Sequence, residues 1–215
     1  MINKVLRAVA LLSLAAAPAS ASVASTSPVV PAPLDTVVFG GGCFWGVQAV
    51  FQHVNGVVSA TSGYAGGTMA KPSYEDVSTG RTGHAEVVRV VYDPSKVSYD
   101  KLLDVFFTVA HDPTQLNRQG PDHGTQYRSA IFYKTEAQKA ATQSYVAQLA
   151  KSGTYRSPIV TQVAPLSAFY VAEPYHQDYA TLHPDEPYIR YNDAPKVAAL
   201  KQQYASLWTD KLAAH

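Results

Sequence analysis

Apolar residues recur along the chain with two different spacings, and these predict both helices and strands. After Cys43 they return every three or four positions, the spacing of one helix face, at Phe44, Val47, Val50, Phe51 and Val54. Residues 84–92 (HAEVVRVVY) are rich in β-branched residues, and counting by two places Glu86 on one face of this strand with Val88 and Val90. A second helical stripe of apolar residues follows Ser98 and continues to residue 110.

The remaining elements follow from the same two spacings. Strands are predicted at residues 35–40, 56–64, 127–133 and 159–163, and helices at residues 135–153 and 195–208. Strands and helices do not alternate regularly enough for a doubly wound parallel sheet. We therefore expect an α+β fold, a two-layer α/β sandwich with a mixed, mainly antiparallel sheet and a long, partly irregular C-terminal segment.

The first residues have the pattern of an export signal. Lys4 and Arg7 precede an apolar run at residues 8–17, and Ala19-Ser20-Ala21 provides the small residues of a cleavage site. The apolar run is shorter than the roughly 20 residues that cross a bilayer, so a membrane anchor is the less favoured alternative. We expect a signal peptide at residues 1–21, a flexible lead-in at 22–34 and one domain at 35–215. The expected location is the bacterial periplasm, without stable membrane insertion after cleavage.

Composition and charge narrow the class of partner. The 215 residues are 47% hydrophobic and 15% charged, which is typical of a globular protein with a substantial core. The formal net charge is +1. This balance does not favour nucleic acid or an anionic membrane as a partner.

Cys43 is the first candidate for chemistry because the sequence contains a single cysteine. One cysteine cannot form a disulfide within the chain, and a lone thiol in a non-reducing compartment is a liability unless it is buried or reactive. Three glycines at residues 40–42 precede Cys43 and place it at a helix start, where free N–H groups favour the thiolate. The alternative is a small buried hydrophobic residue, which is common for a lone cysteine.

Glu86 and two tyrosines are the next candidates. The strand pattern turns Glu86 inward, and burial raises the pKa of a carboxyl, so Glu86 is a candidate general acid. A surface glutamate on a strand is the commoner case. Tyr74 and Tyr127 lie in polar stretches where a phenol could donate a hydrogen bond to a substrate oxygen, although most of the 14 tyrosines must serve packing or the surface.

The seven histidines leave two other functions open. None has the spacing of a metal site, so we expect no metal. His84 or His123 could act as a base for Cys43 in a cysteine hydrolase or acyltransferase, which would need the ring within hydrogen-bond reach of the thiol. A third possibility is a module that binds oxidised peptides without turnover.

Several motifs resemble one known family. Gly42-Cys43-Phe44-Trp45-Gly46 resembles the GCFWG signature of the A-type peptide methionine sulfoxide reductases. Five further segments resemble the family in its order: SGYAGG at 62–67, PSYEDVSTGRTGHAEVV at 72–88, YDP at 92–94, DPTQLNRQGPDHGTQYRSAI at 112–131 and FYVAEPYHQDY at 169–179. The resemblance covers residues 37–204 and implies that residues 35–215 form the catalytic domain, with the family's two-layer sandwich fold.

The resemblance also implies roles for individual residues. Cys43 resembles the nucleophile that attacks the sulfoxide sulfur, and Glu86 matches the carboxyl that donates a proton to the sulfoxide oxygen. Tyr74 and Tyr127 match the two phenols that bind this oxygen. The substrate-binding residues are Phe44 and Trp45, which resemble the seat of the S-methyl group, and Asp122.

The implied activity is thiol-dependent reduction of the S epimer of methionine sulfoxide in oxidised proteins and peptides, and of the free amino acid, as protein repair. Attack by Cys43 releases methionine and leaves a sulfenic acid. No cofactor is required.

Two departures from the family matter. Gln48 stands where many relatives carry Glu, which changes the local field or hydrogen bonding. Residues 195–215 lack the resolving cysteines of many relatives. We therefore expect an external reductant (thioredoxin-like, glutaredoxin-like or a small thiol) and a pocket mouth at Cys43 that the C-terminal segment does not seal.

Overall fold

The structure is a computed structural model that describes residues 33–215, and the expected signal peptide lies outside these residues. The main sheet has six strands in the order β7-β6-β1-β3-β2-β8. The strand bounds are β1 Asp35–Gly40, β2 Val57–Ala65, β3 Ala85–Tyr92, β6 Ala130–Tyr133, β7 Gln162–Pro165 and β8 Phe169–Val171. All neighbours are antiparallel except β6 and β7, so the predicted mixed, mainly antiparallel sheet is confirmed.

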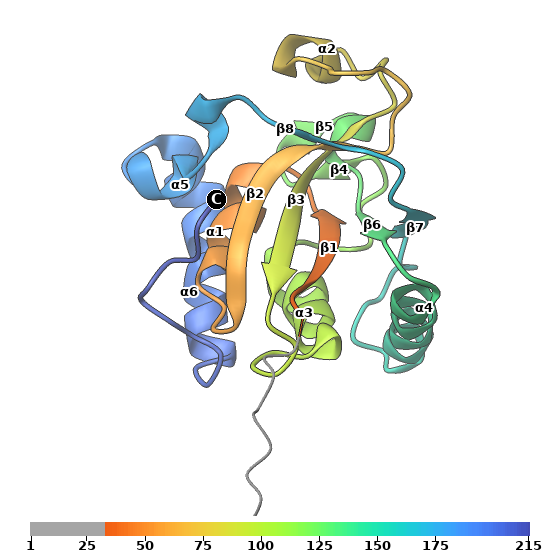
Figure 1. Cartoon of the computed structure of the whole chain (residues 1–215), viewed down its shortest axis with the longest axis vertical. Helices are drawn as coiled ribbons and strands as arrows, with labels where there is room; N and C mark the ends of the chain where they lie inside the picture. Colours follow the sequence, from red (N-terminus) through yellow and green to blue (C-terminus); the bar gives the residue numbers. More distant parts are fainter. Residues whose placement is uncertain (1–32) are drawn as a thin grey trace, which may run out of the picture. The chain divides into compact units, whose positions relative to one another are not determined.

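The helices α1 Phe44–Gln52, α3 Tyr99–Val105, α4 Glu136–Lys151 and α6 Ala194–Gln203 cover one face of this sheet. Two short helices, α2 Tyr74–Ser78 and α5 Tyr179–Leu182, lie outside this layer, and Figure 1 shows α2 beyond the end of the sheet. Figure 1 shows α1 and α6 beside β2, and α4 next to β7. Phe39 of β1 stacks between Phe51 of α1 and Phe106 after α3, with ring centroids 5.0 and 4.5 Å apart. The largest buried apolar cluster therefore lies between the sheet and the helices.

The other face of the sheet is covered by irregular chain. Val38, Val87 and Phe132 are buried there and pack against Leu166 and Phe169. Leu166 lies in the connection between β7 and β8, and Phe169 is the first residue of β8. This stretch crosses from one edge of the sheet to the other (Figure 1). The predicted α+β sandwich with a long, partly irregular C-terminal segment is confirmed. No helix within residues 33–215 is long and apolar enough to cross a membrane.

Two predicted strands begin later than their β-propensity suggests. The strand expected at residues 127–133 starts at Ala130, because Thr125–Tyr127 forms a 3₁₀ turn closed by the bond from the Tyr127 N–H to the Gly124 carbonyl. The strand expected at 159–163 starts at Gln162, since the Val160 N–H donates to the Pro113 carbonyl instead of to β6. Hydrogen bonds to distant loops therefore set both strand starts.

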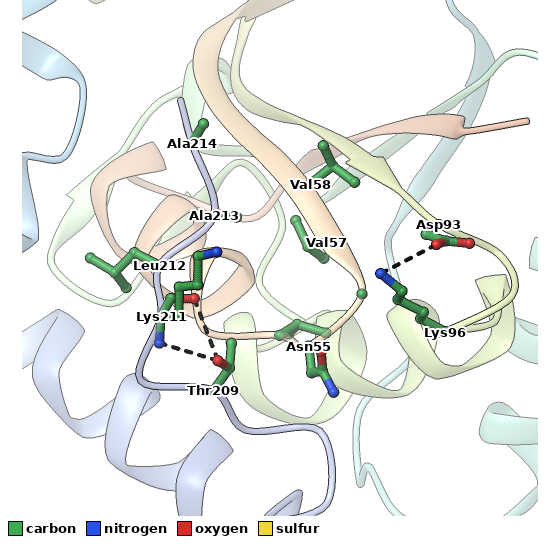
Figure 2. A pocket seen from close by; sticks show the side chains of 12 residues that line it. Asn55, Val57, Val58, Asp93, Lys96, Thr209, Lys211, Leu212, Ala213 and Ala214 are labelled. Carbon is green, nitrogen blue, oxygen red and sulfur yellow. Dashed lines mark hydrogen bonds and ion pairs between the residues drawn. The ribbon is translucent and has the colours of Figure 1, made fainter. Parts of the chain in front are cut away.

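The last residues run back along the start of β2. The Asn55 N–H donates to the Leu207 carbonyl at 2.6 Å, and the Ala60 N–H donates to the Ala214 carbonyl at 2.8 Å. Figure 2 shows the pocket of about 410 Å³ between this tail and the turn before β2. None of the predicted site residues lines it.

Candidate active site

Cys43 lies where β1 turns into α1. Gly42 has a positive φ of 88°, and a Cβ there would lie 2.5 Å from the Gln119 side chain, so the turn requires glycine. Cys43 is the N-cap residue of α1, as predicted, and is 8% exposed.

The ionisation of Cys43 differs from the expectation of a thiolate favoured by the helix start. Burial raises the pKa of the thiol well above its ordinary value, and the carboxyls of Glu86 and Asp193 raise it further. The Trp45 N–H and the Lys196 ammonium lower it, but by less. The resting group is therefore a protonated thiol, because desolvation outweighs the local dipole.

Glu86 is buried beside Cys43. It lies in β3 opposite Tyr64 of β2, is 3% exposed, and its Oε2 accepts the N–H of Phe44 at 3.1 Å. Burial raises the pKa of Glu86 to about 8, with smaller contributions from Asp122 and Asp193, against the lowering effect of the Phe44 N–H. The predicted inward carboxyl is confirmed in position, and at neutral pH it is mainly protonated.

Tyr74 and Tyr127 reach the same place from two separate loops. Tyr74 is the first residue of α2, which Ser73 and Asp76 close with reciprocal side-chain bonds at its N-terminus. Tyr127 ends the 3₁₀ turn before β6. Burial and then the charge of Glu86 raise the pKa of both phenols, so both are neutral hydrogen-bond donors near this carboxyl.

Aromatic rings surround the first turn of α1. Phe44 is buried, with its ring centroid 4.9 Å from that of His176. Trp45 stacks on Tyr179 at 3.9 Å and donates its indole N–H to Nδ1 of His176 at 3.1 Å. These contacts fix the two side chains predicted to seat a methyl group.

The C-terminal segment supplies residues that the sequence did not single out. Glu173 accepts the Tyr64 hydroxyl and the Tyr74 N–H, both at 2.8 Å, and the Tyr188 hydroxyl donates to Asp122. Glu173 and His176 belong to the FYVAEPYHQDY segment, in which the resemblance to the family implies no role for either residue. Tyr188 follows a stretch with no recognisable motif, so no signal pointed to it.

A cavity of about 60 Å³ opens beside Cys43. It is lined by Cys43, Gln119, Gly120, Pro121, Asp122, Tyr188, Asn192 and Lys196. The last three come from the C-terminal segment, which therefore forms one wall of the cavity, while Cys43 remains 8% exposed. Tyr188 is held in this wall by the hydrogen bond that it donates to Asp122.

The structure weighs against a hydrolase. His84 accepts the Gly67 N–H at Nδ1 and bonds the Met69 carbonyl through Nε2, so both of its ring nitrogens are occupied. His123 is exposed in the two-residue strand β5 (Asp122–His123). Within residues 33–215, no histidine bonds Cys43, and no three side chains of His, Cys, Asp or Glu group as metal ligands.

Comparisons with known proteins decide the family. The model of the peptide methionine sulfoxide reductase family matches residues 35–208. The chain belongs to this family. A reductase of Mesorhizobium japonicum, named peptide methionine sulfoxide reductase MsrA 2, is 59% identical over 177 residues, 82% of this chain and 91% of that one. A Synechocystis protein of the same name is 45% identical, covering 94% and 99% of the two chains.

Solved structures agree. Methionine sulfoxide reductase A of Corynebacterium diphtheriae is 40% identical with a TM-score of 0.62, over 70% of this chain and 76% of that chain. Reduced Mxr1 of Saccharomyces cerevisiae is 34% identical with a TM-score of 0.66, over 75% and 92%. The A-type resemblance is confirmed, and the chain is an oxidoreductase of the peptide-methionine (S)-S-oxide reductase class.

Proposed function

We propose that Cys43 reduces the S epimer of methionine sulfoxide, protein-bound and free, to methionine as a repair reaction. The observation that carries this assignment is the buried, mainly protonated Glu86 bonded to the N–H that follows Cys43. A sulfoxide reductase needs a nucleophile for sulfur and an acid for oxygen, and the two groups meet here.

In the reaction, the sulfur of Cys43 attacks the sulfoxide sulfur while Glu86 donates its proton to the oxygen. Tyr74 and Tyr127 hydrogen-bond this oxygen, and Phe44 and Trp45 seat the S-methyl group. The hydroxyl then moves from the substrate sulfur to Cys43, the bond between the two sulfurs breaks, and methionine leaves. The thiol proton of Cys43 replaces the proton that Glu86 donated, so Cys43 ends as a sulfenic acid, oxidised by two electrons, while the substrate is reduced by two.

Asp122 belongs to the substrate-binding surface, and its bond from Tyr188 supports this role by fixing one wall of the cavity. Because one pocket binds the methyl group and one set of donors binds the oxygen, the site accepts only one configuration of the sulfoxide sulfur. Chiral analysis of racemic methionine sulfoxide left after incomplete turnover should show loss of the S epimer only, and equal loss of both epimers would contradict the assignment.

Recycling requires a thiol from outside the chain, because Cys43 is the only cysteine in the sequence. An external thiolate (thioredoxin-like, glutaredoxin-like or a small thiol) attacks the sulfenic sulfur to form a mixed disulfide and water. A second thiolate attacks the outer sulfur and releases Cys43 as a thiolate.

Single-turnover stoichiometry tests this route. Enzyme mixed with excess substrate and no reductant should form one methionine per chain, leave Cys43 reactive to dimedone, and resume turnover when dithiothreitol is added. Cys43→Ser should form none. Two methionines per chain, or a sulfenic acid that no external thiol reduces, would refute the scheme.

We also propose that the chain is exported to the periplasm and cleaved after Ala21. The charged start, the apolar run and the small residues at 19–21 support this step. The intact mass of protein recovered from the periplasmic fraction should lack residues 1–21, and recovery of the full chain from the cytoplasm alone would reject it.

A further inference from the structure

The wall that the C-terminal segment adds to the Cys43 cavity contains an ion pair that the reaction above does not use. Lys196 Nζ lies 3.1 Å from Asp193 Oδ1. The Asp193 side chain is fully buried, whereas Lys196 retains 18% exposure. Asp193 Oδ2 has no hydrogen-bond partner within residues 33–215. A buried carboxylate that is only half satisfied is costly, so its position calls for an explanation.

The pair packs directly on the first turn of α1. A Cβ at Gly46 would lie 2.1 Å from Asp193 Oδ1 and 3.0 Å from Lys196 Nζ. Gly46 therefore makes room for the pair three residues after Cys43. The Lys196 side chain also lines the cavity beside Cys43, where it is the single basic residue among the eight that line it.

The surroundings of Cys43 are otherwise unfavourable for a negative charge. The titratable groups that face it from the packed elements are the carboxyls Glu86, Asp122 and Asp193, the phenols Tyr74, Tyr127 and Tyr188, and the ammonium of Lys196. A sulfur anion among carboxyls and phenols needs a nearby cation, and Lys196 is placed to supply it.

We propose that Lys196, held by Asp193 against Gly46, is a positioning residue that stabilises the thiolate of Cys43. The thiolate forms twice in the proposed function, when Cys43 attacks and when it leaves the mixed disulfide with the electron pair of the broken S–S bond. Asp193 holds the lysine in place and limits its effect, since a carboxylate beside the ammonium offsets part of the positive charge.

The ionisation of Cys43 can be measured without any sulfoxide. The rate of alkylation by iodoacetamide is followed against pH in the full chain and in Lys196→Met, which keeps most of the side-chain stem. In Lys196→Met the midpoint of the profile of alkylation rate against pH should lie about one pH unit or more above that of the parent. At a pH below the midpoint, alkylation of this variant should then be about tenfold slower. Easier access through the wider mouth would raise the rate at every pH without moving the midpoint.

Two further lysine variants complete the test. Lys196→Arg keeps the charge and should leave the midpoint near that of the parent. Lys201→Met is the matched control, because Lys201 lies on the same helix with its side chain 61% exposed. An unshifted midpoint in Lys196→Met, or an equal shift in Lys196→Arg or Lys201→Met, overturns the proposal.

If Lys196→Met does not fold, as judged by circular dichroism, Lys196→Gln decides. It removes the charge but keeps a polar group for Asp193, so the midpoint of the alkylation profile should again rise by about one unit or more, and an unshifted midpoint overturns the proposal. A shifted alkylation profile in an enzyme that releases no methionine would refute only the proposed function, whereas normal methionine release with unshifted profiles would refute only the role of Lys196.

Discussion

Two regions of the chain meet at Cys43, and they are held in different ways. Cys43 is the N-cap of α1 and Glu86 lies in β3; Glu86 accepts the N–H of the residue after Cys43, and both residues are less than a tenth exposed. Tyr188 and Lys196 come from the C-terminal segment and are held by side-chain contacts to Asp122 and Asp193. The reacting groups therefore belong to the rigid frame, while access and charge depend on contacts that single substitutions can remove.

The largest effect should come from the frame. Glu86→Gln keeps the acceptor for the Phe44 N–H but cannot donate a proton, so the chemical step should slow roughly 10²-fold or more. Single-turnover release of methionine measures this step. Glu136→Gln, an exposed carboxyl on α4, is the control and should match the parent. A near-normal rate in Glu86→Gln would show that Glu86 is not the general acid and has a structural role only.

The pH profile sharpens the same point. The pKa of Glu86 is raised to about 8, and the acid is needed in its protonated form. Because Cys43 attacks as a thiolate and its pKa lies above that of Glu86, the single-turnover rate of the parent should rise with pH up to about 8 and then level off, since further gain in thiolate is offset by loss of protonated Glu86. In Glu86→Gln the rate, although lower, should continue to rise through pH 8. The rate is measured against a pH series with the fold monitored at each point.

The phenols should have a smaller effect because two donors share one oxygen. We expect Tyr74→Phe or Tyr127→Phe to slow the chemical step roughly tenfold, and the double variant roughly 10²-fold, since lost donors to a developing charge cost about 1–3 kcal/mol each. Tyr133→Phe, on β6 away from Cys43, serves as the control. Equal rates in the double variant and the parent would show that the two phenols do not bind the sulfoxide oxygen.

The difference between the two regions also explains what could be predicted from sequence. The spacing of apolar residues predicts that Cys43 lies at a helix start and that Glu86 points inward, because this spacing encodes which side of a helix or strand faces the core. Periodicity could not foresee that burial dominates the pKa of Cys43, nor that Tyr188 and Lys196 line its cavity. Those features depend on the path of the long, irregular C-terminal segment. Side-chain hydrogen bonds between residues far apart in the sequence fix this path, and local periodicity does not encode them.

The anchoring of the C-terminal segment gives the next prediction. Glu173 ties the Tyr64 hydroxyl and the Tyr74 N–H to this segment. Glu173→Gln keeps only one of its two acceptor oxygens, so the segment should loosen and KM should rise roughly three- to tenfold, the scale of about one hydrogen bond, with less change in kcat. Steady-state kinetics with dithiothreitol measures both constants. Glu186→Gln, exposed on the same segment, should change neither.

The smallest effect on rate should come from Gln48, the position where many relatives carry Glu. Gln48 is buried, and its Nε2 donates to the Ala60 carbonyl and to Gln177 Oε1, while its Oε1 accepts the Asp178 N–H. An ionised carboxylate at this position would keep the bond from Asp178, but its second oxygen would face two buried acceptors, the Ala60 carbonyl and Gln177 Oε1, with no proton to share. Gln48→Glu should therefore lower the free energy of unfolding by about 1–3 kcal/mol at neutral pH.

The pH dependence of the loss in stability shows whether the buried charge of Gln48→Glu causes it or a general loss of packing does. The carboxyl introduced by Gln48→Glu, buried against two oxygens, would have a pKa above that in the unfolded chain, about 4.3. The loss of stability should thus be smallest below this unfolded value and should grow as pH rises through the folded pKa. Urea unfolding of parent and variant at pH 4 and pH 8 measures the difference, and an equal loss at both would contradict this account. Single-turnover rates should stay within about twofold of the parent, because Gln48 bonds β2 and the C-terminal segment rather than Cys43 or Glu86.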